Sequence, residues 1–235
     1  MKRTSILSLV ILACITTFAA AEPACEDGFV SIFDGKTLDG WDGNPAFWSV
    51  EDGAIVGQTT ADNPTKGNTF LIWRGGKPAN FELLIDYKLT NHNSGIQTRS
   101  FEVEGSKWVV GGYQADIAEN DRFDGIMYGE RFRGIIAYRG QKVTIGENHK
   151  PQVTGSVGDG DELLDAIKKG EWNTYRIVAK DWTITQIING TKIVEVTDAD
   201  IEMRRADGVI ALQLHQGPPM KIEFKNIRLK VLDSE

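Results

Sequence analysis

The sequence predicts an all-β sandwich or barrel. Many short apolar or alternating segments are separated at regular intervals by turn residues, which is typical of all-β folds. Only residues 161–169 show helical spacing. Some longer segments, such as 81–89, are apolar on one face and polar on the other. This pattern favours two stacked sheets, one of them curved around a groove.

Each expected strand rests on a local pattern. In residues 81–89, apolar side chains alternate with polar ones, which predicts one buried face. Asp52-Gly53 and Asn189-Gly190 supply the positive φ angles that tight hairpin turns need. The expected strands, in chain order, are residues 28–33, 48–50, 54–57, 69–73, 81–89, 95–99, 108–117, 126–128, 134–138, 142–145, 172–180, 182–188, 192–196, 208–215 and 222–232.

Residues 161–169 are the one helical candidate. Asp161 is placed to cap this helix, apolar residues such as Leu163 and Ile167 follow at helical spacing, and Gly170 ends it. The segment is short, so we expect it to lie at the periphery of the domain.

Residues 1–21 are typical of a secretory signal peptide. A basic start is followed by an apolar run at residues 6–18 and by Ala19-Ala20-Ala21, an A-x-A cleavage site. The run is too short for a stable membrane span. We therefore expect cleavage after Ala21 and export of the mature chain. A lipid anchor at Cys14 is the alternative, but the residues after Cys14 lack the polar character usual for such a tether.

The remaining residues, 22–235, are expected to form a single β-sandwich domain. No linker or low-complexity tract divides them. Loss of Lys2 and Arg3 with the signal takes the formal net charge from −7 to −9, and an acidic chain without a basic cluster is unsuited to nucleic acid. Cys25 is then the only cysteine, so no internal disulfide can form.

Three of the expected strands, within residues 95–99, 111–117 and 210–215, carry paired polar side chains. At a period of two, each pair lies on one face of its strand. We hypothesise that these strands are neighbours and that their polar faces line one groove. The pairs are Gln97 with Arg99, Gln114 with Asp116, and Gln213 with His215.

Seven short motifs follow one another along the chain, at residues 33–41, 93–99, 112–117, 171–177, 188–190, 212–215 and 224–228. In this order they resemble the bacterial 3-keto-disaccharide hydrolase family, also described as 3-keto-glucoside 1,2-lyase/3-keto-2-hydroxy-glucal hydratase. The resemblance implies a concanavalin A-like jelly-roll sandwich of two antiparallel sheets. It also implies a secreted bacterial protein, periplasmic or extracellular, that acts on a small carbohydrate oxidised at its 3-position.

The chemistry of such a sugar defines what the site must contain. A 3-keto group acidifies the hydrogen on C2, so a base can remove this proton and the C1 substituent then leaves by β-elimination. Addition of water completes a net hydrolysis. The site therefore needs a base, a group that stabilises the enolate, and an acid for the leaving oxygen.

Four residues are the catalytic candidates. His215 titrates near neutrality and is the best base or metal ligand. Arg99 could neutralise an enolate or bind sugar hydroxyls with its planar fork. Asp116 and Glu130 are paired carboxylates, one of which could be an acid with a raised pKa.

Five further residues are candidates for substrate binding. The amides of Gln97, Gln114 and Gln213 suit sugar hydroxyls, and Tyr128 and Arg131 could border the groove from a nearby loop.

No dedicated metal or cofactor motif is present in the sequence. His215 with Asp116 and Glu130 could still hold a divalent ion if the fold brings them together. His92 and His149 lie in turns with no partner pattern, so neither is expected in the site. The alternative to an enzyme is a lectin-like carbohydrate-binding module that uses the same groove without turnover.

Overall fold

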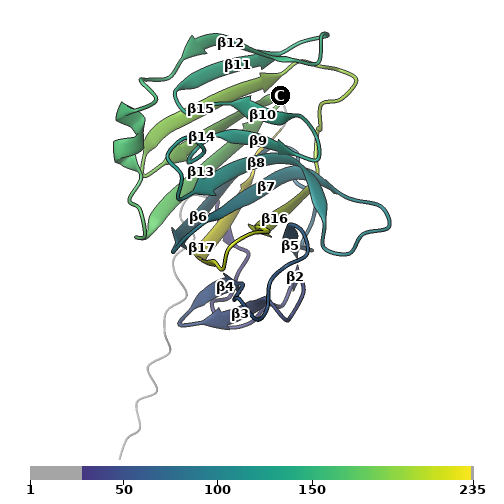
Figure 1. Ribbon diagram of the computed structural model, residues 1–235. Helices are drawn as coiled ribbons and strands as arrows, with labels where there is room; N and C mark the ends of the chain where they lie inside the picture. The colour runs from purple at the N-terminus through teal and green to yellow at the C-terminus, as the bar shows by residue number, and fades with distance from the viewer. Residues whose placement is uncertain (1–27, 234–235) are drawn as a thin grey trace, which may run out of the picture.

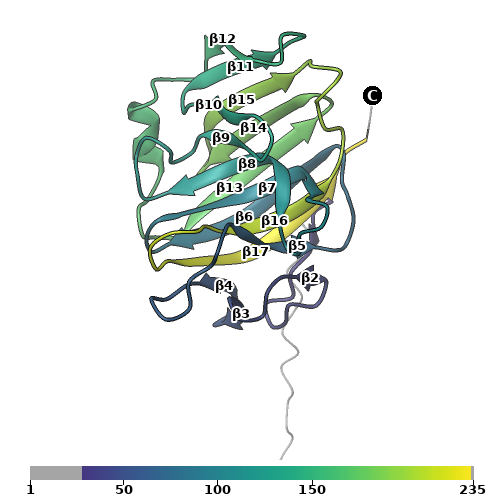
Figure 2. The same cartoon turned by 45° about the vertical axis from the view of Figure 1, so that its right-hand side comes forward.

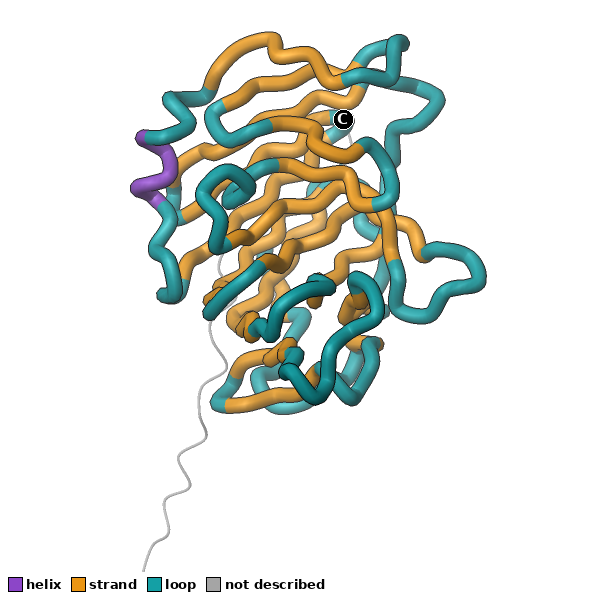
Figure 3. Tube along the Cα trace, viewed as in Figure 1, coloured by secondary structure: helices purple, strands orange, loops and turns teal. Residues whose placement is uncertain are grey.

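The computed structural model describes residues 28–233, which form a sandwich of two β-sheets (Figure 1). Strands account for most of the path of the chain, with one short helix at the edge (Figure 3). The predicted signal peptide, residues 1–21, and the alternative anchor at Cys14 lie outside the described residues.

The larger sheet has ten strands. Nine form a continuous order, and β1 (Val30–Ser31) pairs with β17 beside that path. The order is β12 (Pro151–Ser156), β11 (Gln141–Ile145), β15 (Thr191–Asp198), β14 (Thr183–Ile188), β13 (Asn173–Lys180), β6 (Phe81–Leu89), β17 (Lys221–Val231), β4 (Ala54–Gln58) and β3 (Trp48–Glu51).

The smaller sheet has seven strands. Their order is β10 (Gly134–Ala137), β9 (Met127–Glu130), β8 (Val110–Ala118), β7 (Asn93–Glu102), β16 (Val209–Leu214), β5 (Thr69–Trp73) and β2 (Trp41–Asp42). Among the described strands, only the pairing of β11 with β15 is parallel. The predicted all-β sandwich of two antiparallel sheets is therefore confirmed.

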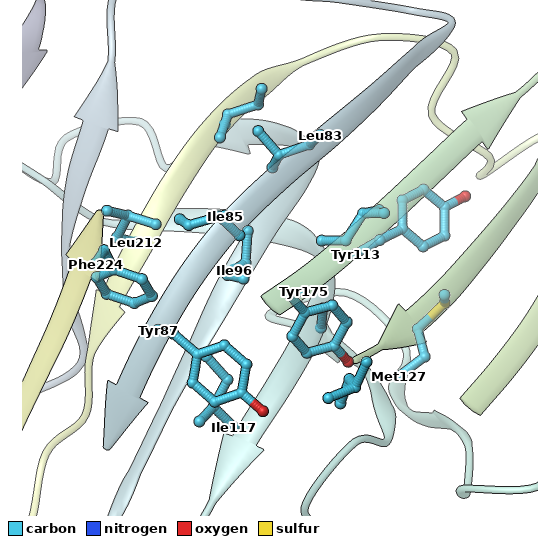
Figure 4. Close-up of a cluster of buried hydrophobic side chains, with 14 of the residues drawn as sticks. Leu83, Ile85, Tyr87, Ile96, Tyr113, Ile117, Met127, Tyr175, Leu212 and Phe224 are labelled. Atoms are coloured by element: carbon cyan, nitrogen blue, oxygen red, sulfur yellow. The ribbon is translucent and has the colours of Figure 1, made fainter. Parts of the chain in front are cut away.

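The hydrophobic core lies between the two sheets. Along β6, every second residue from Phe81 to Leu89 is buried and the residues between them are partly exposed, as the alternation predicts. Leu83 and Ile85 of the larger sheet approach Ile96 and Leu212 of the smaller one (Figure 4). Burial of such side chains stabilises each by about 1.5–3 kcal/mol.

Two hairpins close as their turn residues predict. Asn189 and Gly190 have φ angles of 49° and 83° between β14 and β15, and Asp52 and Gly53 have 48° and 78° between β3 and β4. Both turns need positive φ at two successive residues, which Asn, Asp and Gly tolerate.

The helix predicted at residues 161–169 is only a short 3₁₀ helix, η1 (Glu162–Ala166). Asp161 makes no side-chain cap, so this part of the prediction is wrong. Oδ1 of Asp159 instead accepts hydrogen bonds from the backbone N–H groups of Asp161 and Glu162. The cap lies two residues earlier than the apolar spacing indicated.

Two strands were missed in the sequence. β12 lies at the edge of the larger sheet, and all but its first residue are exposed, so no apolar alternation marks it. β2 has only two residues and follows the turn at Gly40. Both owe their conformation to a neighbouring strand rather than to their own sequence.

The central strands of the smaller sheet are covered on both faces. Every residue of β8 and of β16 is buried. Polar residues on the face away from the core are therefore held inside the protein. Within residues 28–233, no helix has the length and apolar character needed to cross a membrane.

Candidate functional site

Strands β8, β7 and β16 are neighbours in the smaller sheet, as hypothesised from their polar faces (Figure 2). Gln97 of β7 lies opposite Gln114 of β8 on one side and Ala211 of β16 on the other. Polar side chains from this sheet face a cleft of about 310 Å³. The polar residues that line the cleft are Asn68, Asn93, Gln114, Asp116, Tyr128, Glu130, Gln213 and His215.

Two carboxyl groups reach this cleft from neighbouring strands. Asp116 of β8 is 6% exposed and Glu130 of β9 is 8% exposed. Burial raises the pKa of Asp116 to about 8, although the Gln114 amide opposes the shift, and the nearby Glu130 adds to it. Burial also raises the pKa of Glu130, against hydrogen bonds from Asn68. Asp116 is therefore mostly protonated at neutral pH and can donate a proton.

His215 follows the last residue of β16 and lines the same cleft. Its Nδ1 lies 2.6 Å from the carbonyl oxygen of Gln216 and 3.1 Å from Nε2 of His92. A carbonyl oxygen only accepts, so an Nδ1–H tautomer satisfies Gln216 and leaves a lone pair on Nε2. Burial lowers the pKa of His215, which favours the neutral ring.

His92 and His149 both have partners in the structure, and neither residue lines the cleft. The His92 ring meets the His215 ring edge to face, with centroids 4.9 Å apart. Nδ1 of His149 lies 2.8 Å from Oδ2 of Asp200, outside the cleft lining. These partners are 123 and 51 positions away along the chain, so local sequence could not reveal them.

Asn68 connects the two sides of the cleft and was missed in the sequence. Its Nδ2 donates to the carboxylate oxygens of Glu130 at 3.4 and 3.3 Å, and its Oδ1 accepts from the backbone N–H of Gln216 at 3.0 Å. Asn68 thus ties Glu130 to the residue that follows His215. A single amide in a polar loop before β5 carries no signal of this role.

The other lining residues missed in the sequence are Asn93, Phe123, Ile126 and Ile135. Phe123 lies between two expected strands, and Ile126, expected to begin the second of them, directly precedes β9. An isolated apolar residue between strands gives no periodic pattern, so only the fold shows that these side chains line the cleft.

The three glutamines are hydrogen-bonded to one another. Nε2 of Gln97 and Nε2 of Gln213 donate to Oε1 of Gln114 at 2.6 and 3.0 Å. Nε2 of Gln114 donates in turn to Oδ1 of Asp116 at 2.5 Å. Gln114 and Gln213 line the cleft, whereas Gln97 does not. The position of Gln97 therefore does not support the direct sugar contact predicted for it.

The prediction that Gln97 and Arg99 share a face is wrong. The pairing of β7 with β8 is irregular around Arg99, which has a φ of 44°, and such a bulge interrupts the alternation of side chains. The Ser100 hydroxyl takes the place next to Gln97 and donates to its Oε1 at 2.6 Å. The Arg99 guanidinium instead donates to the carbonyl oxygen of Ala79 at 2.9 and 2.6 Å. Arg99 is absent from the cleft lining, so the catalytic role predicted for it lacks support.

Tyr128 and Arg131 differ in their relation to the cleft. Tyr128 lies on β9 opposite Gln114 and lines the cleft, and burial raises the pKa of its hydroxyl, which keeps the proton. The side chain of Arg131 is 52% exposed, and its Nε lies 3.9 Å from Oε1 of Glu130. Arg131 is therefore next to the cleft but does not line it.

Within residues 28–233, no group of three or more His, Cys, Asp or Glu side chains is placed to hold a metal ion. His215, Asp116 and Glu130, which were considered as ligands in case the fold brought them together, line one cleft but do not form such a group. What the cleft does combine is a neutral imidazole, a protonated carboxyl group and a phenol. These three groups suit proton transfer.

Comparisons with known proteins agree with this architecture. Residues 28–230 match the model of the 3-keto-alpha-glucoside-1,2-lyase-like domain. A 3-keto-disaccharide hydrolase of Bacteroides thetaiotaomicron is 25% identical over 257 residues, which cover 90% of this chain and 81% of that protein.

Solved structures with the same fold include proteins of different function. One is a Parabacteroides distasonis protein provisionally described as a glycosyl hydrolase, with a TM-score of 0.56, 21% identity and coverage of 87% of this chain and 99% of that one. Another is the carbohydrate-binding module CBM66 from Bacillus subtilis, with a TM-score of 0.52, 14% identity and coverage of 81% and 95%. At these identities the likeness shows the fold alone.

Proposed function

The chain belongs to the family of 3-keto-alpha-glucoside-1,2-lyase-like domains, and from this membership we propose that it cleaves the glycosidic bond of 3-keto-glucosides. The proposed reaction is β-elimination followed by hydration, with net hydrolysis. One observation carries the proposal: His215 and Asp116, whose pKa values are displaced in opposite directions, line the same cleft. A neutral base beside a protonated acid is what this reaction requires at neutral pH.

His215 is the proposed base. Its Nε2 lone pair takes the proton from C2, and the electron pair of the C–H bond moves into an enolate whose negative charge rests on the 3-keto oxygen. The enolate then reforms the ketone, a double bond forms between C1 and C2, and the bond from C1 to the leaving oxygen breaks. Water adds to C1 in the second stage and restores the proton on C2.

Asp116 is the proposed acid. A carboxyl group with a pKa of about 8 holds its proton at pH 7 and can transfer it to the departing oxygen. The ionised Asp116 left behind can then accept a proton from the incoming water. Glu130, whose pKa burial also raises, lies on the neighbouring strand and supports the same proton exchange.

Tyr128 takes the role first considered for Arg99. Because Arg99 is outside the cleft, the enolate oxygen needs another donor, and the Tyr128 hydroxyl keeps its proton in this environment. A donor positioned before the reaction stabilises the developing negative charge at little reorganisation cost. Gln213 and Asn93 remain for the sugar hydroxyls.

The direct test is incubation of the protein with a 3-keto-glucoside that carries a chromogenic leaving group. We expect release of the leaving group, and a fall of about 10²–10⁴-fold in kcat for His215→Gln. His149→Asn is the matched control, because His149 lies outside the cleft lining. The same assay with a chelator added tests whether release of the leaving group needs a divalent ion. Saturable binding without release would contradict the enzyme and support a lectin-like carbohydrate-binding module.

Location outside the cytoplasm is part of the same proposal. It rests on the signal-peptide pattern at residues 1–21 and on Ala19-Ala20-Ala21 before the expected cleavage site. Mass spectrometry of the mature N-terminus would distinguish cleavage after Ala21 from acylation at Cys14.

A further inference from the structure

We propose that Gln97 is a positioning residue that acts on Asp116 through Gln114 and does not touch the substrate. The inference rests on the proposed function only in taking Asp116 as the acid. Gln97 is fully buried, and the cleft lining excludes it. Gln97 can therefore influence the cleft only through its hydrogen bonds, which connect it to Asp116 by way of Gln114.

A continuous chain of hydrogen bonds joins Ser100 to Asp116 across two strands. The Ser100 hydroxyl donates to Oε1 of Gln97 at 2.6 Å, and Nε2 of Gln97 donates to Oε1 of Gln114 at 2.6 Å. Nε2 of Gln114 then donates to Oδ1 of Asp116 at 2.5 Å. None of these residues is more than 6% exposed, so water cannot readily replace a member of the chain.

The direction of the chain follows from the chemistry of its last member. When Asp116 is ionised, its carboxylate only accepts hydrogen bonds, so in that state the NH₂ group of Gln114 faces Asp116 and its carbonyl oxygen faces Gln97. Gln97 then presents its NH₂ group, as Gln213 does from the other neighbouring strand. A turned Gln114 amide would bring like groups together at both contacts. Gln97 and Gln213 thus hold the amide in the orientation that stabilises ionised Asp116.

Gly95 provides the space for this arrangement. It lies opposite Asp116 in the pairing of β7 with β8, beneath the Gln114 side chain. A Cβ on Gly95 would stand 2.6 Å from Cδ and Cγ of Gln114, which is too close for a real contact. The φ angle of Gly95 does not require glycine, since it is not among the positive-φ glycines. Glycine is therefore needed at this position because the Gln114 side chain occupies the space of a Cβ.

The consequence for Asp116 has a definite sign. Burial favours its protonated form, and donation from Gln114 favours the ionised form and limits the rise of its pKa. The negative charges of Glu130 and Asp124 add to the rise, and a hydrogen bond with Asn93 opposes it. Removal of the Gln97 donor loosens Gln114, weakens this donation and raises the affinity of Asp116 for its proton. Asp116 then keeps its proton to higher pH, so the alkaline limb of the pH profile moves upward.

The test replaces Gln97 with methionine, which has similar volume and no donor. The pKa of Asp116 is measured in the intact protein by carbon NMR of labelled aspartate, with Asp116→Asn to assign the signal. We expect Gln97→Met to raise this pKa by about half a unit or more, since one charge-assisted hydrogen bond corresponds to about 1–2 units. Ser100→Ala should shift it in the same direction by less. Gln186→Met, at a buried glutamine of the larger sheet, is the matched control and should leave it unchanged.

Each outcome is decisive. An unchanged pKa of Asp116 in both Gln97→Met and Ser100→Ala overturns the inference, and Ser100→Ala alone decides if Gln97→Met does not fold. A rise in KM for a 3-keto-glucoside without a shift of the pH profile also overturns it, because Gln97 would then contact the sugar. If the NMR shift occurs but neither the wild-type protein nor any variant releases a leaving group, the positioning role stands and the proposed function fails.

Discussion

Nε2 of His92 lies 3.1 Å from Nδ1 of His215, and both nitrogens approach the carbonyl oxygen of Gln216. A second imidazole, that of His92, thus contacts the proposed base through its Nδ1 side. The ring of His92 reaches this position next to Gly217, where a Cβ would stand 2.4 Å from Nε2 of His92. Gly217 therefore leaves the space that the His92 ring needs beside His215.

Removal of the second imidazole should make His215 more basic. Burial lowers the pKa of His215 and the neighbouring His92 contributes in the same direction. Asparagine tolerates the φ of 71° at position 92, so His92→Asn should fold normally. We expect a higher pKa of His215 by proton NMR, with the acidic limb of kcat/KM moved to higher pH. His149→Asn, at a φ of 60°, is the control, and equal titration curves in all three proteins would contradict this role of His92.

The pH dependence of kcat/KM should be bell-shaped. Activity falls at low pH as His215 gains a proton, at a pKa below the usual 6.5. It falls again near pH 8, where Asp116 loses its proton. Asp116→Asn should remove the alkaline limb and lower kcat by about 10²–10⁴-fold. Asp39→Asn, at an exposed site, should keep both limbs. An alkaline limb that persists in Asp116→Asn would assign it to another group.

Arg99 should matter for stability and not for turnover. Its guanidinium is buried and donates to the carbonyl oxygen of Ala79 and to Oδ1 of Asn80. Arg99→Met leaves these acceptors without their donor, so the free energy of unfolding should fall by about 2–4 kcal/mol, with kcat of the folded protein nearly unchanged. Urea titration and steady-state kinetics test this. An Arg99→Met protein with unchanged stability and a large loss of kcat would contradict this and support a catalytic role for Arg99.

His149 should stabilise the fold more in its protonated form than in its neutral form. A hydrogen bond to Asp200 raises its pKa, burial opposes the shift, and Glu202 adds to it. The contribution of His149 is therefore fully present below its unfolded pKa of about 6.5 and is lost as the pH rises through the higher folded value. His149→Asn should lower the melting temperature most near pH 5.5 and least near pH 9. A deficit that is constant with pH would contradict this.

Part of the site could be predicted because it follows the strand period. Gln114 with Asp116, and Gln213 with His215, lie on the cleft face as their alternation indicates, and the three strands are neighbours as hypothesised. Alternation is reliable along β8 because its pairing with β7 is regular from residue 113 to residue 118. The same rule failed at Arg99, where a bulge turns the side chain to the other face.

Other features depend on contacts that no local pattern contains. Asn68 meets Glu130 across 62 positions of the chain, and His92 meets His215 across 123. Gly95 belongs to a predicted strand, yet its purpose appears only when Gln114 is seen to cross above it. Such relationships arise from the sheet order, which brings together residues from separate parts of the sequence.

The most direct test of the proposed function is the fate of deuterium placed on C2 of a 3-keto-glucoside. β-Elimination begins with loss of this atom to His215, so we predict a primary isotope effect on kcat/KM when proton abstraction limits the rate. The free sugar should carry hydrogen from the solvent at C2, and His215→Gln should slow the exchange and the release of the leaving group together. Release of the leaving group with deuterium fully retained at C2 would contradict elimination and indicate direct hydrolysis.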